Sequence, residues 1–173
     1  RLTIAGLGAI GMRVASTVDN GEIDGVRLTA IAAKNLKRAD RRVSDFHNPP
    51  QIVPIGELVN HADIVVECAP SGLFYDLAQA TIAKGLIFVP LSVGQLLHHP
   101  ELIDQARQSG AKIMVPTGAL IGLDTVRAMA VGNIKSVTLQ TRKPPQGLEG
   151  APHLISNNIN ISNLSEPLCV LKG

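Results

Sequence analysis

Three glycines near the start of the chain constrain its fold more than any other feature. Gly6, Gly8 and Gly11 follow the apolar run LTIAG and open a segment of helical periodicity. In a strand–turn–helix unit, the first glycine makes the tight turn, the second admits a dinucleotide pyrophosphate to the backbone, and the third lets helix and strand pack closely. The helix N-terminus adds N–H groups and a positive dipole. Three glycines also suit a tight turn that binds nothing, so the rest of the chain has to decide.

The sequence up to residue 116 alternates short apolar runs with longer helical segments. The runs, typical of buried parallel strands, cover 2–6, 27–33, 51–55, 62–69, 86–92 and 111–116. Helical periodicity covers 11–20, 36–45, 72–84 and 100–109, and Gly110 is placed to close the last helix. This order predicts an α/β fold with a doubly wound parallel sheet of the Rossmann type. In that context the glycine pattern predicts nucleotide binding.

Composition excludes several other classes of function. Aromatic residues make up 2% of the chain and the formal net charge is +2, so nucleic acid is not an expected partner. No apolar run approaches the roughly 20 residues of a membrane span, and we expect neither membrane nor metal binding. Cys68 and Cys169 stand in apolar runs, which predicts buried free thiols and a cytoplasmic location.

The choice of coenzyme depends on the end of the second strand. An NAD-preferring site usually has Asp or Glu there, to hold the ribose hydroxyls. This chain has IAAKNLKRADRR, with Lys34 at the strand end and Asp40 as the one acid. A cation attracts the 2′-phosphate of NADP that a carboxylate would repel, so the sequence allows NADP as well as NAD. A solvated basic helix face explains the same cations, since Lys37 and Arg41 are simple i, i+4 neighbours.

Further contacts should come from the carboxyl ends of the other strands, where ligands bind in open α/β sheets. Those ends are CAPSG, LSVGQ and PTGAL, small residues that ordinary turns also use. The predicted coenzyme contacts are Gly6, Gly8, Ala9, Ile10, Gly11, Lys34, Ala69, Pro70, Ser92, Val93, Thr117, Gly118 and Ala119.

The pattern changes after Pro116. A loop leads into a helix that ends at Gly132, and residues 133–143 (NIKSVTLQTRK) alternate like a half-exposed antiparallel strand. We therefore expect a coenzyme domain over 1–122 and the start of a second α/β domain over 123–173. Arg142 and Lys143 leave the expected strand as adjacent cations that suit a dicarboxylate, although at most one can face a cleft. A solvated strand edge is the alternative.

Several stretches together resemble the L-aspartate dehydrogenase family. They are GLGAIG (6–11), ADIVVECAP (62–70), LSVGQLL (91–97), VPTGALIGLD (115–124), VTLQTRKPP (137–145) and LSEPLCVLKG (164–173). The resemblance implies oxidation of L-aspartate with NAD or NADP to iminoaspartate, which hydrolyses to oxaloacetate and ammonia or feeds NAD biosynthesis. It also implies homodimers with a Rossmann domain and an α/β catalytic domain, and places Ala119 at the nicotinamide.

The same resemblance implies that the acid/base histidine lies in a further segment after Gly173. We therefore expect no catalytic residue among these 173 residues and no turnover by them alone. A homoserine-dehydrogenase-like enzyme, a dihydrodipicolinate-reductase-like enzyme and a non-catalytic nucleotide-binding module remain alternatives, because each could carry the same first domain.

Overall fold

The computed structural model describes residues 1–117 and 122–172. The chain forms two compact units, Arg1–Leu123 and Asp124–Gly173. Among the described residues, no helix is both long and apolar enough to cross a bilayer.

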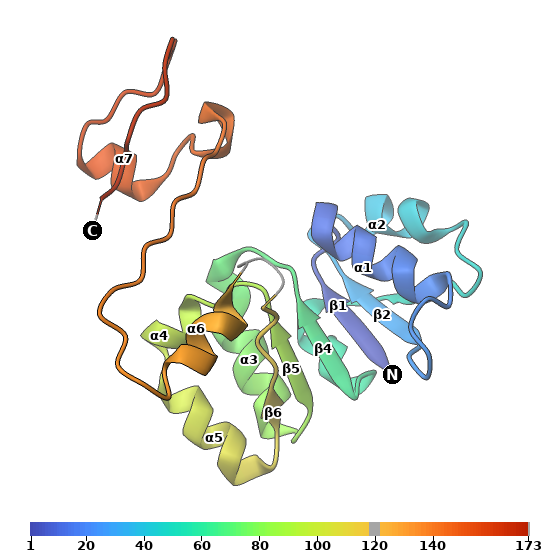
Figure 1. Cartoon of the computed structure of the whole chain (residues 1–173). Coiled ribbons are helices and arrows are strands. Elements are labelled where there is room, and N and C mark those ends of the chain that lie inside the picture. Colours follow the sequence, from blue (N-terminus) through green and yellow to red (C-terminus); the bar gives the residue numbers. More distant parts are fainter. Residues whose placement is uncertain (118–121, 173) are drawn as a thin grey trace. The chain divides into compact units, whose positions relative to one another are not determined.

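The first unit is built on a six-stranded parallel sheet (Figure 1). Its strands are β1 (Leu2–Ala5), β2 (Leu28–Ala32), β3 (Gln51–Ile52), β4 (Ile64–Glu67), β5 (Ile87–Pro90) and β6 (Lys112–Ile113). Their spatial order is β3-β2-β1-β4-β5-β6. The strand order therefore reverses between β1 and β4, as in a doubly wound Rossmann sheet. The predicted fold class is confirmed, and every predicted strand of this unit is present.

Helices connect the strands as the periodicity predicts. They are α1 (Ala9–Asp19), α2 (Leu36–Val43), α3 (Phe74–Ala83), α4 (Gln95–His98) and α5 (Glu101–Ser109), with short 3₁₀ turns η1 (Ile55–Asn60) and η2 (Ser71–Leu73). Gly110 has a φ of 75° and closes α5 in the left-handed conformation, as predicted.

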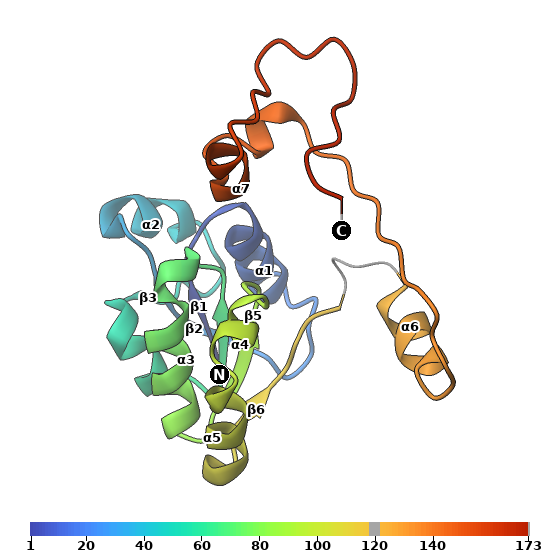
Figure 2. The same cartoon turned by 90° about the vertical axis from the view of Figure 1, so that its left-hand side faces the viewer.

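The core lies on both faces of the sheet, because successive strand side chains point to opposite sides. Ile4 and Ile31 face the buried sides of α1 and α2. Ala5 and Phe88 face the other layer, which is made by η1, α3 and α5. Figure 2 shows α1 and α3 on opposite sides of the sheet. With both faces covered, the strands can be apolar almost throughout, which explains the continuous apolar runs of the sequence.

The second unit contains most of α6 (Leu123–Met129), then η3 (Pro145–Gly147) and α7 (Pro152–Ser156). The predicted helix before Gly132 is present as α6. Leu154 of α7 is buried, and the Nε2 of His153 donates to the carbonyl oxygen of Val170 at 2.9 Å. This contact ties α7 to the last residues of the unit.

The prediction of an antiparallel strand over residues 133–143 is wrong. These residues lie in neither helix nor strand, and Val137 and Leu139 are 62% and 63% exposed. A strand needs backbone hydrogen bonds from a neighbouring strand, and the described part of Asp124–Gly173 contains none. The alternating side chains therefore have no sheet on which to pack.

The prediction that both thiols are buried is also wrong. Both cysteines are free, but Cys169 is exposed and Cys68 is only partly buried. Cys169 lies in a segment without secondary structure, where apolar neighbours in sequence do not bury a side chain.

Candidate coenzyme site

The turn between β1 and α1 is packed so tightly that two of its residues must be glycine. Gly6 has a φ of +95°, and a Cβ there would collide with the carbonyl group of Cys68. A Cβ on Gly11 would collide with the carbonyl oxygen of Gly6. Gly6 makes the turn and Gly11 brings α1 against it, so both glycines have a structural reason.

Gly8 has no such reason within the protein. It is the N-cap of α1 with a φ of −75°, and a Cβ there would have no protein atom within 4 Å. Its carbonyl accepts the first helical hydrogen bond from Met12 at 3.0 Å. Any L-residue could adopt this conformation, so the fold itself does not require glycine here. The missing side chain leaves the space outside the turn open.

An open groove passes over this turn, with a volume of about 1140 Å³. It lies where the carboxyl ends of β1, β2 and β4 meet, beside the reversal of strand order. In open α/β sheets this is the usual place for a ligand. The described lining residues are Gly6, Leu7, Gly8, Ala9, Ala33, Lys34, Asn35, Leu36, Lys37, Arg38, Ala39, Arg42, Cys68, Ala69 and Pro70.

The β2–α2 side of the groove is strongly basic. Lys34, Lys37, Arg38 and Arg42 line it, and its described lining contains no acidic residue. Asn35 begins α2 as its N-cap, with the side-chain oxygen accepting the N–H of Arg38 at 2.9 Å. The groove therefore combines a helix N-terminus with four cationic side chains, which is an arrangement suited to phosphate.

Arg42 also joins this basic side to the glycine turn. Its Nη1 donates to the carbonyl oxygen of Leu7 at 2.5 Å. Because a guanidinium offers several donors, the same side chain holds the turn and leaves N–H groups available to the groove. The sequence suggested a basic helix face but not this link.

Sequence reasoning missed Glu67, the last residue of β4. It is fully buried, and its carboxylate accepts the backbone N–H of Ala69 at 3.1 Å and that of Ser92 at 2.8 Å. Burial, together with the negative charge of Glu67, raises the pKa of the neighbouring Cys68 thiol to about 11. Cys68 is therefore a neutral thiol at physiological pH. An acid at the end of an otherwise apolar strand was the available signal.

The structure brings some of the predicted contacts together and leaves others apart. Gly6, Gly8, Ala9, Lys34, Ala69 and Pro70 line the groove, with Gly11 buried beneath the turn. Ile10 is 59% exposed and is not among the described lining residues. The described lining also leaves out Ser92 and Val93, which follow β5, and Thr117, which follows β6. Gly118 and Ala119 lie outside the described residues.

The predicted dicarboxylate contacts belong to the second unit. Arg142 and Lys143 are exposed in the segment that precedes η3, outside any strand. The strand geometry that would have turned one of them inward is therefore missing, and their role stays a prediction.

Several histidines take part in local contacts away from the groove. The Nδ1 of His47 lies 3.2 Å from the carboxylate of Asp19, and His99 stacks obliquely on Tyr75 with ring centroids 4.5 Å apart. In the described part of the groove no lining residue is a histidine. Among the described residues, no cluster of His, Cys, Asp and Glu could hold a metal ion.

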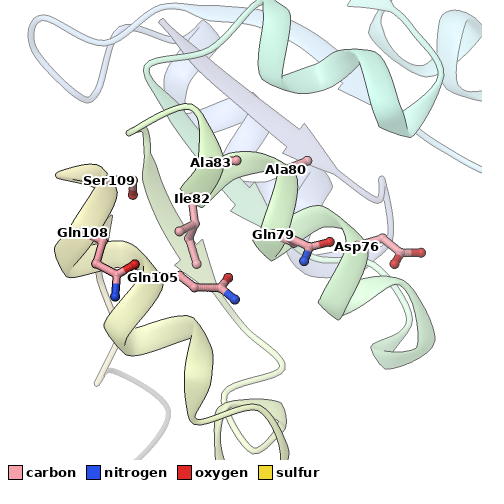
Figure 3. A pocket seen from close by; sticks show the side chains of 8 residues that line it. All are labelled: Asp76, Gln79, Ala80, Ile82, Ala83, Gln105, Gln108 and Ser109. Atoms are coloured by element: carbon pink, nitrogen blue, oxygen red, sulfur yellow. The ribbon is translucent and has the colours of Figure 1, made fainter.

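A second groove of about 710 Å³ lies between α3 and α5 (Figure 3). It is lined by Asp76, Gln79, Ala80, Ile82, Ala83, Gln105, Gln108 and Ser109. Several of these residues come from the last turns of α3 and α5, which lead back to the amino ends of the strands. The groove is thus away from the edge where ligands of such sheets bind.

Comparison with known families agrees with this arrangement. A family model described as "Homoserine dehydrogenase, NAD binding domain" matches residues 6–116, and one described as "Aspartate dehydrogenase, C-terminal" matches residues 124–173. Residues 6–116 therefore form an NAD(P)-binding domain, and the matched span contains the whole described groove.

Solved structures show the same fold at low sequence identity. A probable dehydrogenase from Thermotoga maritima aligns with a TM-score of 0.62 at 17% identity, over 76% of this chain and 40% of that one. Biliverdin reductase from Synechocystis sp. PCC 6803, solved with biliverdin and NADP⁺, gives 0.57 at 21% identity, over 76% and 42%.

Curated relatives match over the whole chain. An L-aspartate dehydrogenase of Bradyrhizobium diazoefficiens is 46% identical over 100% of this chain and 61% of its own length. L-aspartate dehydrogenase 3 of Bordetella bronchiseptica is 43% identical over 99% of this chain and 63% of its own length. The chain thus spans less than two thirds of these relatives. Because the two family models follow each other along it and this likeness runs from end to end, the chain belongs to the L-aspartate dehydrogenase family.

Proposed function

We propose that the protein containing this chain oxidises L-aspartate to iminoaspartate with NAD⁺ or NADP⁺. The observation that carries the proposal is the succession, on one chain, of an NAD-binding domain and the beginning of an aspartate dehydrogenase C-terminal region. The glycine turn and its groove support it, because Gly8 faces open space that the turn itself does not need and the groove over the turn leaves room for a dinucleotide.

The residues of the groove fit such a coenzyme. Gly8 leaves its side of the groove open, so a pyrophosphate can approach the first N–H groups of α1. Lys34 and Arg38 stand where the adenosine ribose of a Rossmann ligand binds, and they would attract the 2′-phosphate of NADP. We propose that NADP is accepted together with NAD for this reason.

The reaction moves one hydride and one proton. Bound NAD⁺ or NADP⁺ supplies the hydride acceptor. The Cα–H bond of aspartate breaks with its electron pair leaving as hydride, while the amine loses a proton to a general base and the C=N bond forms. Water then adds to the imine and ammonia leaves, which gives oxaloacetate. Among the described residues we assign no general base.

For the substrate carboxylates we propose Arg142 and Lys143. Both carry exposed positive charge in the second unit, and a guanidinium can bind a carboxylate through two parallel hydrogen bonds. This assignment also rests on the family resemblance of the TRKPP stretch.

We propose further that the whole protein acts as a homodimer on small molecules, in the cytoplasm, and that its imine product can serve NAD biosynthesis. Large apolar side chains that the second unit leaves exposed support association, among them Val131 (94% exposed) and Leu171 (71%). The two free cysteines support a reducing compartment.

A substrate panel tests the proposed function. Purified intact protein is given NAD⁺ or NADP⁺ with L-aspartate, D-aspartate or L-homoserine, and the absorbance of the reduced coenzyme is followed. We expect reduction with L-aspartate only. Reduction with L-homoserine in its place would support the homoserine-dehydrogenase-like alternative. Coenzyme binding without turnover on any amine would support a non-catalytic nucleotide-binding module.

A further inference from the structure

The carboxylate of Glu67 connects the turns that follow two neighbouring strands. Its Oε1 accepts the N–H of Ala69 and the hydroxyl of Ser92, both at 3.1 Å. Its Oε2 accepts the N–H of Leu91 at 3.1 Å and that of Ser92 at 2.8 Å. Ala69 belongs to the turn after β4, and Leu91 and Ser92 belong to the turn after β5.

The Glu67 side chain is fully buried. Burying a carboxylate is costly unless hydrogen bonds replace its water, and here three backbone N–H groups and one hydroxyl do so. The N–H groups of Ala69 and Ser92 can only donate, and each meets a different carboxylate oxygen, while the N–H of Leu91 is shared between the carboxylate and the main-chain carbonyl oxygen of Glu67. Bonds of this kind are stronger than those between neutral groups.

Those turns lie at the edge of the sheet that carries the groove. Ala69 and Pro70 line the groove directly, and the turn after β5 is joined to theirs through the pairing of β4 with β5 and through Glu67. The N–H groups of Ala69 and Ser92 lie outside helices and strands. Both N–H groups donate to the Glu67 carboxylate.

We propose that Glu67 is a positioning residue, whose carboxylate clamps the turns after β4 and β5 together and thereby shapes the wall of the groove that receives the coenzyme. The ligand in this statement rests on the proposed function, but the clamp itself does not. Glu67 does not line the groove, so it acts through Ala69 and Pro70.

Amide hydrogen exchange in the unsubstituted protein tests the clamp without any ligand. The N–H groups of Ala69 and Ser92 should exchange slowly, although neither residue is in a regular element, because a buried carboxylate holds them. Exchange of these two amides as fast as that of exposed loop amides would overturn the proposal, whatever the protein binds.

Substitution then separates positioning from plain stability. Glu67→Gln keeps the shape but puts an NH₂ group where an acceptor is needed. We expect faster exchange at Ala69 and Ser92 and roughly tenfold weaker binding of NAD⁺ and NADP⁺, the change that accompanies loss of one hydrogen bond to a charged group. The control is Thr81→Val, which removes the buried bond from the Thr81 hydroxyl to the carbonyl of Leu77 on α3. It should lower the melting temperature while leaving exchange at the two turns and coenzyme affinity unchanged.

The outcomes are distinct. Faster exchange together with weaker binding in Glu67→Gln, but not in Thr81→Val, supports the proposal. Faster exchange with unchanged coenzyme affinity overturns the positioning role, and equal loss of affinity in both variants does so too. If the unsubstituted protein binds no coenzyme, the proposed function fails, while the exchange of Ala69 and Ser92 still decides whether the clamp exists. If Glu67→Gln does not fold, exchange in the unsubstituted protein decides alone.

Discussion

Gly8 can be substituted without a clash inside the protein, although we expect the coenzyme to need glycine at this position. Valine at this position meets no protein atom within 4 Å of its Cβ, so we expect Gly8→Val to fold with a melting temperature close to that of the unsubstituted protein. Its side chain would occupy the approach of the pyrophosphate, and binding of NAD⁺ and NADP⁺ should be lost in a calorimetric titration.

The matched control is Gly56→Val. Gly56 lies in η1, also without a protein atom within 4 Å of its Cβ, but outside the described lining of the groove. It should bind coenzyme normally. Unchanged affinity in Gly8→Val would contradict the assignment of the glycine turn to the pyrophosphate.

Cys68 should show how the buried charge of Glu67 acts on its surroundings. Burial and that charge raise the pKa of the Cys68 thiol to about 11, and only the thiolate is alkylated. In a Cys169→Ser background, the rate of alkylation of Cys68 should therefore rise with pH and reach half of its maximum near pH 11. Glu67→Gln removes the charge, so the midpoint should move to lower pH. A midpoint unmoved by Glu67→Gln would contradict the electrostatic link.

Among single residues, the sequence predicted those whose role follows from local spacing. Gly6, Gly8 and Gly11 form a recognisable pattern because one turn dictates all three. The role of Glu67 depends on a neighbouring strand that arrives about two dozen residues later, at Leu91 and Ser92. Such a contact becomes visible only when the order β1-β4-β5 is known.

Among the elements, we expect the β2–α2 turn to set the preference between NADP⁺ and NAD⁺, because its basic side chains line the groove. Lys34→Asp replaces attraction with repulsion at the end of β2. We expect affinity for NADP⁺ to fall at least tenfold, the effect of roughly one charge-assisted hydrogen bond, while affinity for NAD⁺ changes little. Calorimetric titrations with both coenzymes measure the ratio.

Lys112→Asp supplies the control, since it makes the same charge change on the exposed Lys112 of β6, outside the described groove lining. Both affinities should be unaffected there. If Lys34→Asp weakens NAD⁺ and NADP⁺ equally, Lys34 does not discriminate between them and the basic turn is a solvated helix face.

The helices and strands that could be predicted are those whose own residues show which side chains are buried. The apolar runs of β1, β4 and β5 mark strands covered on both faces, and helix ends such as Gly110 have local causes. Residues 133–143 show where this reasoning stops. Alternation describes which side chains would share a face, but a neighbouring strand is needed to realise it.

In the whole molecule, the two units differ in how much of their own structure they bury. The unit Arg1–Leu123 has its own core on both faces of the sheet and an open groove over the glycine turn. The unit Asp124–Gly173 buries little beyond Leu154 among its described residues. Composition and periodicity could predict the first unit because its core is assembled from nearby strands and helices. The second has few contacts from which a side chain's role could be inferred.

We propose that the intact protein takes a hydride from the Cα of L-aspartate, and an isotope label tests this proposal. The most direct measurement gives the intact protein L-aspartate deuterated at Cα together with NAD⁺ or NADP⁺, and determines the mass of the reduced coenzyme. We predict that the reduced coenzyme carries the deuterium and that Gly8→Val forms none of it. Reduced coenzyme without deuterium, or no reduced coenzyme from an intact protein that binds NAD⁺ or NADP⁺, would contradict the account.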